Sequence, residues 1–382
     1  MEIKYNSIIY MESLSTLFIL FLILIGVGFF YKQIESKFKN DDNQFNDNMI
    51  QKYLLSDDDL DNEKKPILWI HIPYEYNARN WQSFGSRSSF DLNQPYLYLT
   101  VKSIINQCNE SFKICIIDDH SFDKLLPNWN INMSRISNPI SENMRTLGLM
   151  KLIYRYGGLL CPISFVCMKN LIGLYNEGTA GSKMFLCETN DKNVTSASYD
   201  FYPSTSFCGA PKETKMVEQL IDFIQRTIST DFTAESKFLG SFDRWCEARI
   251  KNRQINKIDG SKIGVKTTDE MPIKIEDLMS NHYLKLHLET YGILIPSDEI
   301  LNRVHYEWFA RMSQKQVIES DTIIGNYLLL SNAPDCQQGV IEPLKNRPSW
   351  VGFWKTPLYD GVYGLKPNFL GDNLIKEKYP GR

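Results

Sequence analysis

The segment Arg145–Leu171 constrains the fold most, because its residue pattern changes from helical to strand-like at two adjacent glycines. Before the glycines, apolar residues recur at helical spacing. Gly157 and Gly158 are typical of the point where a helix ends and a residue with φ > 0 is needed. Leu159–Met168 is then an apolar run broken by Pro162. The segment predicts a helix, a sharp stop and a strand. Because proline cannot donate to a central ladder, Pro162 is expected at an edge, a bulge or the end of the strand.

Other parts of the chain continue this alternation. The residue patterns predict strands at Leu68–His71, Phe112–Ile117 and Lys183–Cys187, and helices at Pro95–Cys108 and Met216–Thr227. Strands that alternate with helices predict a doubly wound, Rossmann-like α/β sheet. Ligands of such sheets bind beyond the carboxyl ends of the strands, so residues at strand ends are the first candidates for a site.

The same residues carry a family resemblance. The pattern resembles the GT-A-like glycosyltransferases of the "sugar-binding region containing a DXD motif" and capsular-polysaccharide-synthesis type, over roughly residues 66–230. Six residues keep that family's helix–glycine–strand frame: Tyr154, Tyr156, Gly157, Gly158, Lys169 and Leu171. His71 fits the first strand of the family, and Asp118 and Asp119 fit an Asp-Asp pair at the end of the next strand.

The acidic pair that gives the family its motif is missing here. Its two Asp positions fall near Pro162 and Ser164. In the family, such a pair holds a divalent metal that neutralises charge on the leaving diphosphate. Mg²⁺ and Mn²⁺ prefer hard oxygen ligands, which proline lacks and which a serine hydroxyl supplies only weakly. We therefore expect no cofactor and no metal ligands, with Mn²⁺ or Mg²⁺ relevant only if catalysis survives without the pair.

Candidate site residues follow from strand ends and from the resemblance. For nucleotide binding they are His71, Asp118, Asp119 and Arg145. The alternative for the Asp pair is a cap on the following helix. Glu188 and Asp191 are candidates for a base at an acceptor hydroxyl, with ordinary polar strand ends as the alternative.

A diphosphate without a metal needs cations. Arg145, Arg155 and Lys169 are the nearest in sequence, and a charged helix face is the alternative explanation. Arg145 and Arg155 are ten residues apart on one predicted helix, so they need not converge.

The N-terminal part predicts a membrane anchor. Leu14–Tyr31 is an uncharged run of 18 residues, which spans roughly 27 Å as a helix, about one hydrocarbon core. A cleaved signal peptide or a buried helix are the alternatives, but the run lacks a basic start and a small-residue exit. The count of basic residues on the two sides of the run favours the cytoplasmic side for the large domain, by a margin of about one charge, whereas a Golgi-type transferase would need the opposite orientation.

The residue patterns divide the chain into four regions. We expect an anchor at 1–31, an acidic stalk at 32–65, a glycosyltransferase-like domain at 66–330 and an irregular packed tail at 331–382. The eight cysteines are scattered without C-x-x-C spacing, so buried free thiols are the favoured interpretation. A net charge of −3 gives no reason to expect nucleic acid as a partner.

Two functions are consistent with these features. The first is a membrane-anchored glycosyltransferase-like protein without metal-dependent catalysis, which binds a sugar, a nucleotide sugar or another protein, or serves as a structural component. The second is an active transferase that moves a sugar from a nucleotide-sugar donor without the acidic pair. The chain also resembles glycosyltransferase-like proteins of large DNA viruses of eukaryotes, which implies a single-pass protein of a host endomembrane or of the virion membrane.

Overall fold

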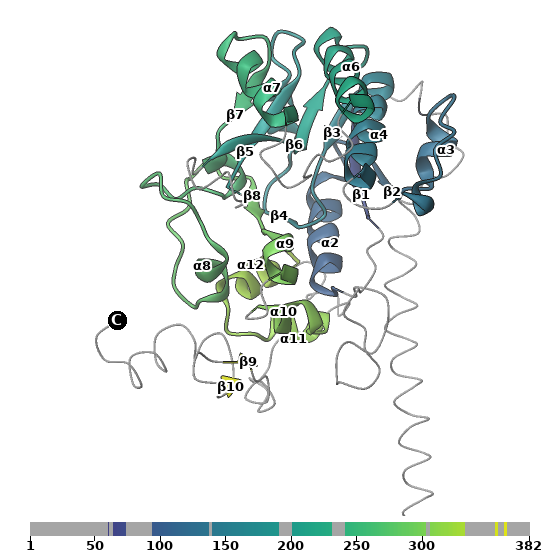
Figure 1. Ribbon diagram of the computed structural model, residues 1–382. Helices are drawn as coiled ribbons and strands as arrows, with labels where there is room; N and C mark the ends of the chain where they lie inside the picture. Colours follow the sequence, from purple (N-terminus) through teal and green to yellow (C-terminus); the bar gives the residue numbers. More distant parts are fainter. Residues whose placement is uncertain are drawn as a thin grey trace, which may run out of the picture. The chain divides into compact units, whose positions relative to one another are not determined.

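The computed structural model describes residues 60, 64–73, 94–136, 140–190, 201–230, 241–302, 306–332, 356–357 and 363–364, all within the compact unit Asp57–Arg382 (Figure 1). The predicted anchor Leu14–Tyr31 and the stalk, apart from residues 60, 64 and 65, lie outside them. Among the helices that are described, none has the length and apolar character needed to cross a membrane.

A six-stranded sheet forms the centre of the fold, in the order β2-β1-β3-β6-β5-β7. The pairs β1–β2, β1–β3 and β5–β7 are parallel, whereas β6 runs antiparallel to both of its neighbours. The domain is therefore mixed α/β with a mostly parallel sheet, as the alternation predicted. In sheet order the strands are Lys113–Ile117 (β2), Ile67–His71 (β1), Gly158–Leu160 (β3), Tyr202–Ala210 (β6), Phe185–Thr189 (β5) and Asn256–Ile258 (β7).

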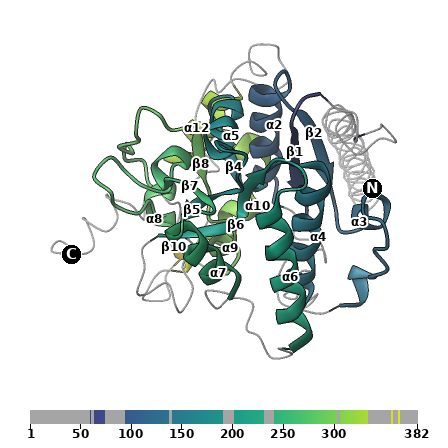
Figure 2. The same ribbon diagram turned by 90° about the horizontal axis from the view of Figure 1, so that it is seen from above.

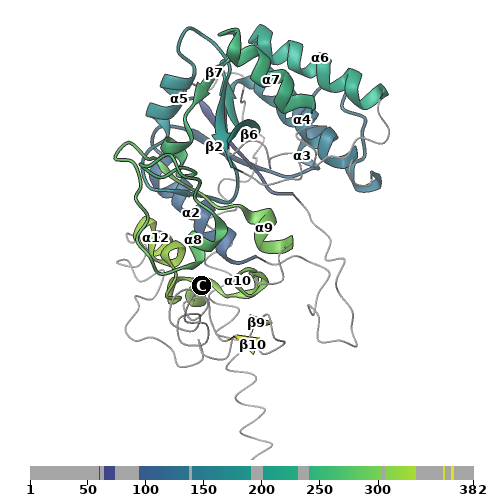
Figure 3. The same ribbon diagram turned by 60° about the vertical axis from the view of Figure 1, so that its left-hand side comes forward.

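Helices cover both faces of this sheet (Figures 2 and 3). One face carries α4 (Ile140–Tyr156), α6 (Lys215–Thr230) and α7 (Ser241–Lys251). The other face carries α2 (Tyr96–Cys108) and α5 (Ile172–Gly178), while the short α3 (Ser121–Leu125) and the 3₁₀ turn η2 (Met133–Arg135) follow β2. The strands predicted at Leu68–His71, Phe112–Ile117 and Lys183–Cys187 and the helices predicted at Pro95–Cys108 and Met216–Thr227 are confirmed, with ends that shift by a few residues.

Two glycines end α4 as predicted. Gly157 has φ +70° and donates its N–H to the Ile153 carbonyl at 2.9 Å, and Gly158 has φ +108°. A Cβ on Gly158 would overlap the carbonyl oxygen of Ile67 on the neighbouring β1. Both the backbone angle and the close approach of β1 therefore require glycine here.

The predicted strand Leu159–Met168 is wrong as a single element. It is divided into β3 and β4 (Phe165–Cys167), and Pro162 lies between them in a turn that Phe165 closes by donating to the Pro162 carbonyl at 3.1 Å. β3 belongs to the main sheet, whereas β4 pairs antiparallel with β8 (Gly292–Leu294) in a second, two-stranded sheet. Because proline has no N–H for the ladder, the chain changes sheets where it occurs.

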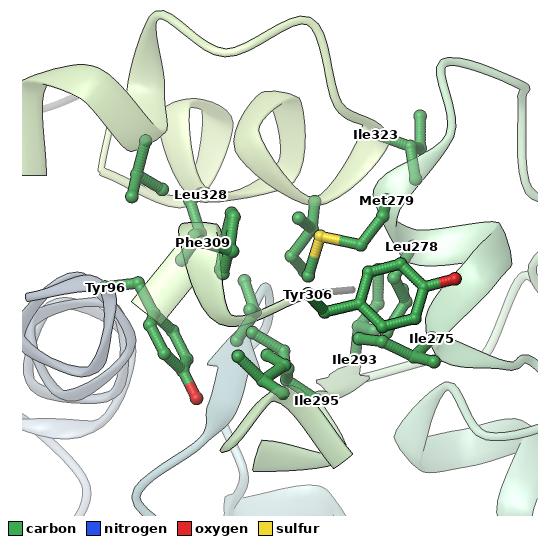
Figure 4. Close-up of a cluster of buried hydrophobic side chains, with 14 of the residues drawn as sticks. Tyr96, Ile275, Leu278, Met279, Ile293, Ile295, Tyr306, Phe309, Ile323 and Leu328 are labelled. Carbon is green, nitrogen blue, oxygen red and sulfur yellow. The ribbon is translucent and has the colours of Figure 1, made fainter. Parts of the chain in front are cut away.

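A second hydrophobic core joins α2 and this small sheet to the later helices (Figure 4). Tyr96 of α2 contacts Phe309 with ring centroids 5.1 Å apart, and Ile275, Ile293 and Leu328 are fully buried in the same cluster. The later elements are η4 (Gly260–Ile263), α8 (Ile275–Met279), α9 (Ser297–Asn302), α10 (Glu307–Arg311), α11 (Gln314–Ile318) and α12 (Ile323–Ser331).

The remaining predictions concern the tail and the thiols. Of residues 333–382, the structure describes only β9 (Thr356–Pro357) and β10 (Tyr363–Gly364), which pair antiparallel. The seven cysteines among the described residues are buried and free, as predicted.

Candidate functional site

The candidate site lies at the carboxyl edge of three parallel strands. β1 has β2 on one side and β3 on the other, so the chain reverses its direction of progress across the sheet at β1. In α/β sheets, ligands bind beyond the carboxyl ends of the strands at such a point. His71 is the last residue of β1, and Asp119 comes two residues after β2.

Asp119 connects three elements at this edge. Its Oδ1 is 2.9 Å from Nε2 of His71 and accepts from Nε of Arg145 at 2.9 Å, and its Oδ2 is 2.8 Å from a terminal nitrogen of Arg145. Arg145 lies on α4, so β1, the β2 end and α4 each supply one of the three side chains. Such a forked contact between guanidinium and carboxylate is a strong, geometrically specific pair.

The three side chains are largely enclosed. The exposed fractions are 8% for His71, 14% for Asp119 and 19% for Arg145. Burial alone would raise the pKa of Asp119, but the hydrogen bonds from His71 and Arg145 and the positive charge of Arg145 outweigh it and lower the pKa to about 2. The Asp119 carboxylate is therefore ionised at neutral pH.

The His71 ring has a second constraint besides Asp119. It stacks on the ring of Phe122 in α3, with centroids 5.7 Å apart and an interplanar angle of 10°. Phe122 is fully buried, so the stacking partner is itself held in place. The orientation of the His71 ring is therefore fixed by its hydrogen bond to Asp119 and by its stacking on Phe122.

Asp118 does not join this cluster. Its Oδ1 accepts from the backbone N–H of Ser121 at 2.9 Å and from the Ser121 hydroxyl at 2.7 Å, and the side chain is exposed. It closes the turn before α3, whose N-cap residue is His120, so Asp118 has a local role in the loop and is not the helix cap.

The segment from Pro162 to Ser164 connects the two sheets. The carbonyl of Ser164 accepts from the N–H of Ile295 at 3.2 Å, and Ser164 is 4% exposed. The hydroxyl of Thr100 donates to the carbonyl of Ile163. Pro162 and Ser164 bring no carboxylate to this edge, so a metal held here would need other ligands.

Glu188 lies in a separate buried ion cluster at the end of β5. Its Oε1 is 2.8 Å from Nζ of Lys257, and its Oε2 is 2.6 Å from Nζ of Lys266 and accepts from the Gly260 N–H at 3.2 Å. Burial raises the pKa of Glu188, but the two lysines outweigh it and the net pKa is lowered. A carboxylate held in this way is a poor proton acceptor, so this geometry favours a structural role. Asp191, the other candidate base, lies outside the described residues.

The candidate cations do not converge. The guanidinium of Arg155 lies 5.2 Å from the ring of Tyr156, and Nζ of Lys169 donates to the carbonyl of Leu288 at 2.7 Å. Of the three cations, Arg145 alone contacts Asp119 among the described residues.

Sequence reasoning missed Lys257, Lys266 and the stacking role of Phe122. The lysines come from β7 and the chain beyond η4, where no local sequence pattern marks a site.

In the described part of the chain, no group of three or more His, Cys, Asp or Glu side chains is arranged to hold a metal ion. No protein-family model matches the chain, and no curated protein matches it.

Proposed function

We propose that this chain is a membrane-anchored, glycosyltransferase-like protein with a GT-A-like domain that binds a sugar or a nucleotide sugar without metal-dependent catalysis. In this role it is a binding or interaction protein. The observation that carries the proposal is the convergence of His71, Asp119 and Arg145 at the carboxyl edge of β1 and β2. That edge is where open α/β sheets bind nucleotides and related ligands.

The residue types at the neighbouring edge support the loss of metal-dependent chemistry. The segment after β3 has Pro162 and Ser164 where the resembled family has its acidic pair. Without a metal, the two to three negative charges of a diphosphate need protein donors. Arg145 is the only one of the three candidate cations that lies in the Asp119 cluster, as far as the described residues extend.

Calorimetry on the full-length chain in detergent micelles tests the proposal. UDP-sugars and GDP-sugars are titrated with and without Mn²⁺. We expect binding of at least one of them, with the same affinity in both conditions. Binding that Mn²⁺ strengthens, or sugar transfer that EDTA abolishes, would identify an ordinary metal-dependent enzyme, and no binding at all would identify a scaffold.

A matched pair of variants on α4 locates the binding edge. Arg145→Gln should weaken binding by roughly 1.5–3 kcal/mol, the usual value of a hydrogen bond to a charged group, which is about 10- to 150-fold in Kd. Arg155→Gln removes the same charge ten residues further along the helix and should leave Kd unchanged. Circular dichroism confirms that both variants fold.

The active-transferase alternative is favoured by one feature, the pairing of His71 with Asp119. A carboxylate–histidine pair is a common general base, able to take a proton from an acceptor hydroxyl. Release of free sugar or of a glycosylated product in EDTA from a nucleotide sugar, lost in His71→Phe, would favour this alternative.

A further inference from the structure

The hydrogen bonds of Asp119 determine which nitrogen of His71 carries the proton. Arg145 donates to both carboxylate oxygens, which keeps Asp119 ionised. An ionised carboxylate can only accept hydrogen bonds. The 2.9 Å contact between Nε2 of His71 and Oδ1 of Asp119 therefore requires the hydrogen on Nε2.

This leaves the other ring nitrogen as an acceptor. In a neutral imidazole with its hydrogen on Nε2, Nδ1 carries a lone pair. None of the described residues donates a hydrogen bond to Nδ1. The stack on Phe122 and the bond to Asp119 hold the ring plane, so the direction of this lone pair is fixed.

The charges of the cluster indicate which chemical group this acceptor fits. Arg145 is a cation on Asp119, with a terminal nitrogen 2.8 Å from Oδ2, whereas the Nδ1 lone pair of His71 is uncharged and can only accept a hydrogen bond, so it cannot bind a phosphate oxygen. A neutral acceptor fits a neutral donor, and the commonest neutral donor on a sugar or a nucleoside is a ring hydroxyl.

We propose that Nδ1 of His71 accepts a hydrogen bond from a ring hydroxyl of the bound ligand, and that Asp119 is the positioning residue that holds the ring in this tautomer. This rests on the proposed function, the binding of a sugar or nucleotide sugar at the edge of β1 and β2. The hydroxyl belongs either to the ribose or to the hexose of the nucleotide sugar, and the two sources are separable by experiment.

The tautomer is tested first, without ligand. The full-length chain with ¹⁵N-labelled histidine in detergent micelles has five histidines, and His71→Phe identifies the His71 signals. At pH 8 we expect a protonated Nε2 and an unprotonated Nδ1 for His71, and a change in this pattern in Asp119→Asn. A hydrogen on Nδ1 in the wild type would overturn the proposal.

Calorimetry then tests the hydroxyl. The ligands are UDP-glucose and GDP-mannose, each beside its parent diphosphate, with the 2′-deoxy and 3′-deoxy forms of both diphosphates. We expect His71→Phe, which keeps a flat ring, to weaken binding by about 3- to 10-fold, the usual effect of losing one neutral hydrogen bond. His120→Phe is the control, because His120 is adjacent to Asp119 in the chain but exposed.

The ligands that lose affinity show whether the hydroxyl belongs to the ribose or to the hexose. A ribose hydroxyl is indicated if His71→Phe weakens the diphosphate and the nucleotide sugar equally and if a deoxy diphosphate binds the wild type more weakly. A hexose hydroxyl is indicated if only the nucleotide sugar loses affinity in His71→Phe.

Other outcomes overturn the inference. If nucleotides bind, but His71→Phe and the wild type have the same relative affinities for the diphosphates, their deoxy forms and the nucleotide sugars, the inference fails and the proposed function stands. If neither the nucleotide sugars nor the diphosphates bind, both fail. Should His71→Phe not fold, the histidine signals that change in Asp119→Asn are assigned to His71, and the wild type is titrated with the deoxy diphosphates for the ribose case and with nucleotide sugars that lack one hexose hydroxyl for the hexose case.

Discussion

Replacement of Asp119 by asparagine should destabilise the domain in a way that depends on pH. Asp119→Asn removes one negative charge while it keeps the size of the side chain and one acceptor oxygen. The pKa of Asp119 is lowered from its ordinary 3.8 to about 2 by His71 and Arg145, against the effect of burial. Such a change in pKa on folding corresponds to about 2 kcal/mol of stability at pH 7. Because the side chain is only 14% exposed, solvent weakens these contacts little.

The direction of the pKa change determines whether the destabilisation by Asp119→Asn grows or shrinks as the pH falls. A carboxyl group whose pKa is lowered in the folded state stabilises it above the unfolded pKa, and this contribution is lost as the pH falls toward the folded pKa. The difference between wild type and Asp119→Asn should therefore be complete above about pH 5 and fall to about half near pH 3.

Urea unfolding followed by tryptophan fluorescence measures this difference. With an m-value of about 2–3 kcal/mol/M, the midpoint of Asp119→Asn at pH 7 should fall by roughly 1 M. Asp118→Asn is the matched control, because Asp118 is exposed and its carboxylate contacts Ser121, for which an amide oxygen can substitute. Equal losses in the two variants, or a loss for Asp119→Asn that is the same at pH 7 and pH 3, would refute this reasoning.

Three further predictions concern the glycine stop, the Glu188 cluster and the N-terminal part. Gly158→Ala should lower the free energy of unfolding by more than about 3 kcal/mol, because its Cβ would overlap backbone of β1 at φ +108°. Gly181→Ala is the control, with φ +72° and its nearest contact at 3.8 Å, and should lower the free energy of unfolding by about 1–2 kcal/mol. Similar urea midpoints for the two variants would contradict this prediction. Glu188→Gln should lower the free energy of unfolding by roughly 1–3 kcal/mol, because Lys257 and Lys266 both lose a carboxylate, although Lys266 keeps Asp259 at 3.1 Å. The lowered pKa of Glu188 means that this loss is complete at neutral pH and shrinks on acidification, so a loss that grows toward acid pH in thermal unfolding argues against the cluster. Deletion of residues 1–60 should leave a soluble, folded protein by size-exclusion chromatography and circular dichroism; an insoluble or unfolded product would show that the stalk is part of the domain.

The elements that sequence predicted well are those with local signals. β1, β2, α2 and α4 have apolar spacing, turn residues or glycines within a few positions of their ends. The stop at Gly157 is such a case, because a residue with φ > 0 after a helix is a local requirement.

The predictions that failed or were missed depend on distant partners. The apolar character of Leu159–Met168 predicted a strand, but only pairing with Gly292–Leu294 shows that its second half belongs to another sheet. The second core, which joins Tyr96 to Phe309 and Leu328, likewise has no local signal at either end.

For the site, the sequence by itself determined the candidates, and the tertiary structure decided which of them meet. His71, Asp118, Asp119 and Arg145 were identified from strand ends and a family resemblance. The fold brings three of them together across sequence separations of 48 and 26 residues and turns Asp118 toward its own helix. The physical reason is that helix and strand propensity act between neighbours along the chain, whereas strand order, and with it the set of side chains at one edge of the sheet, is set by contacts between distant segments.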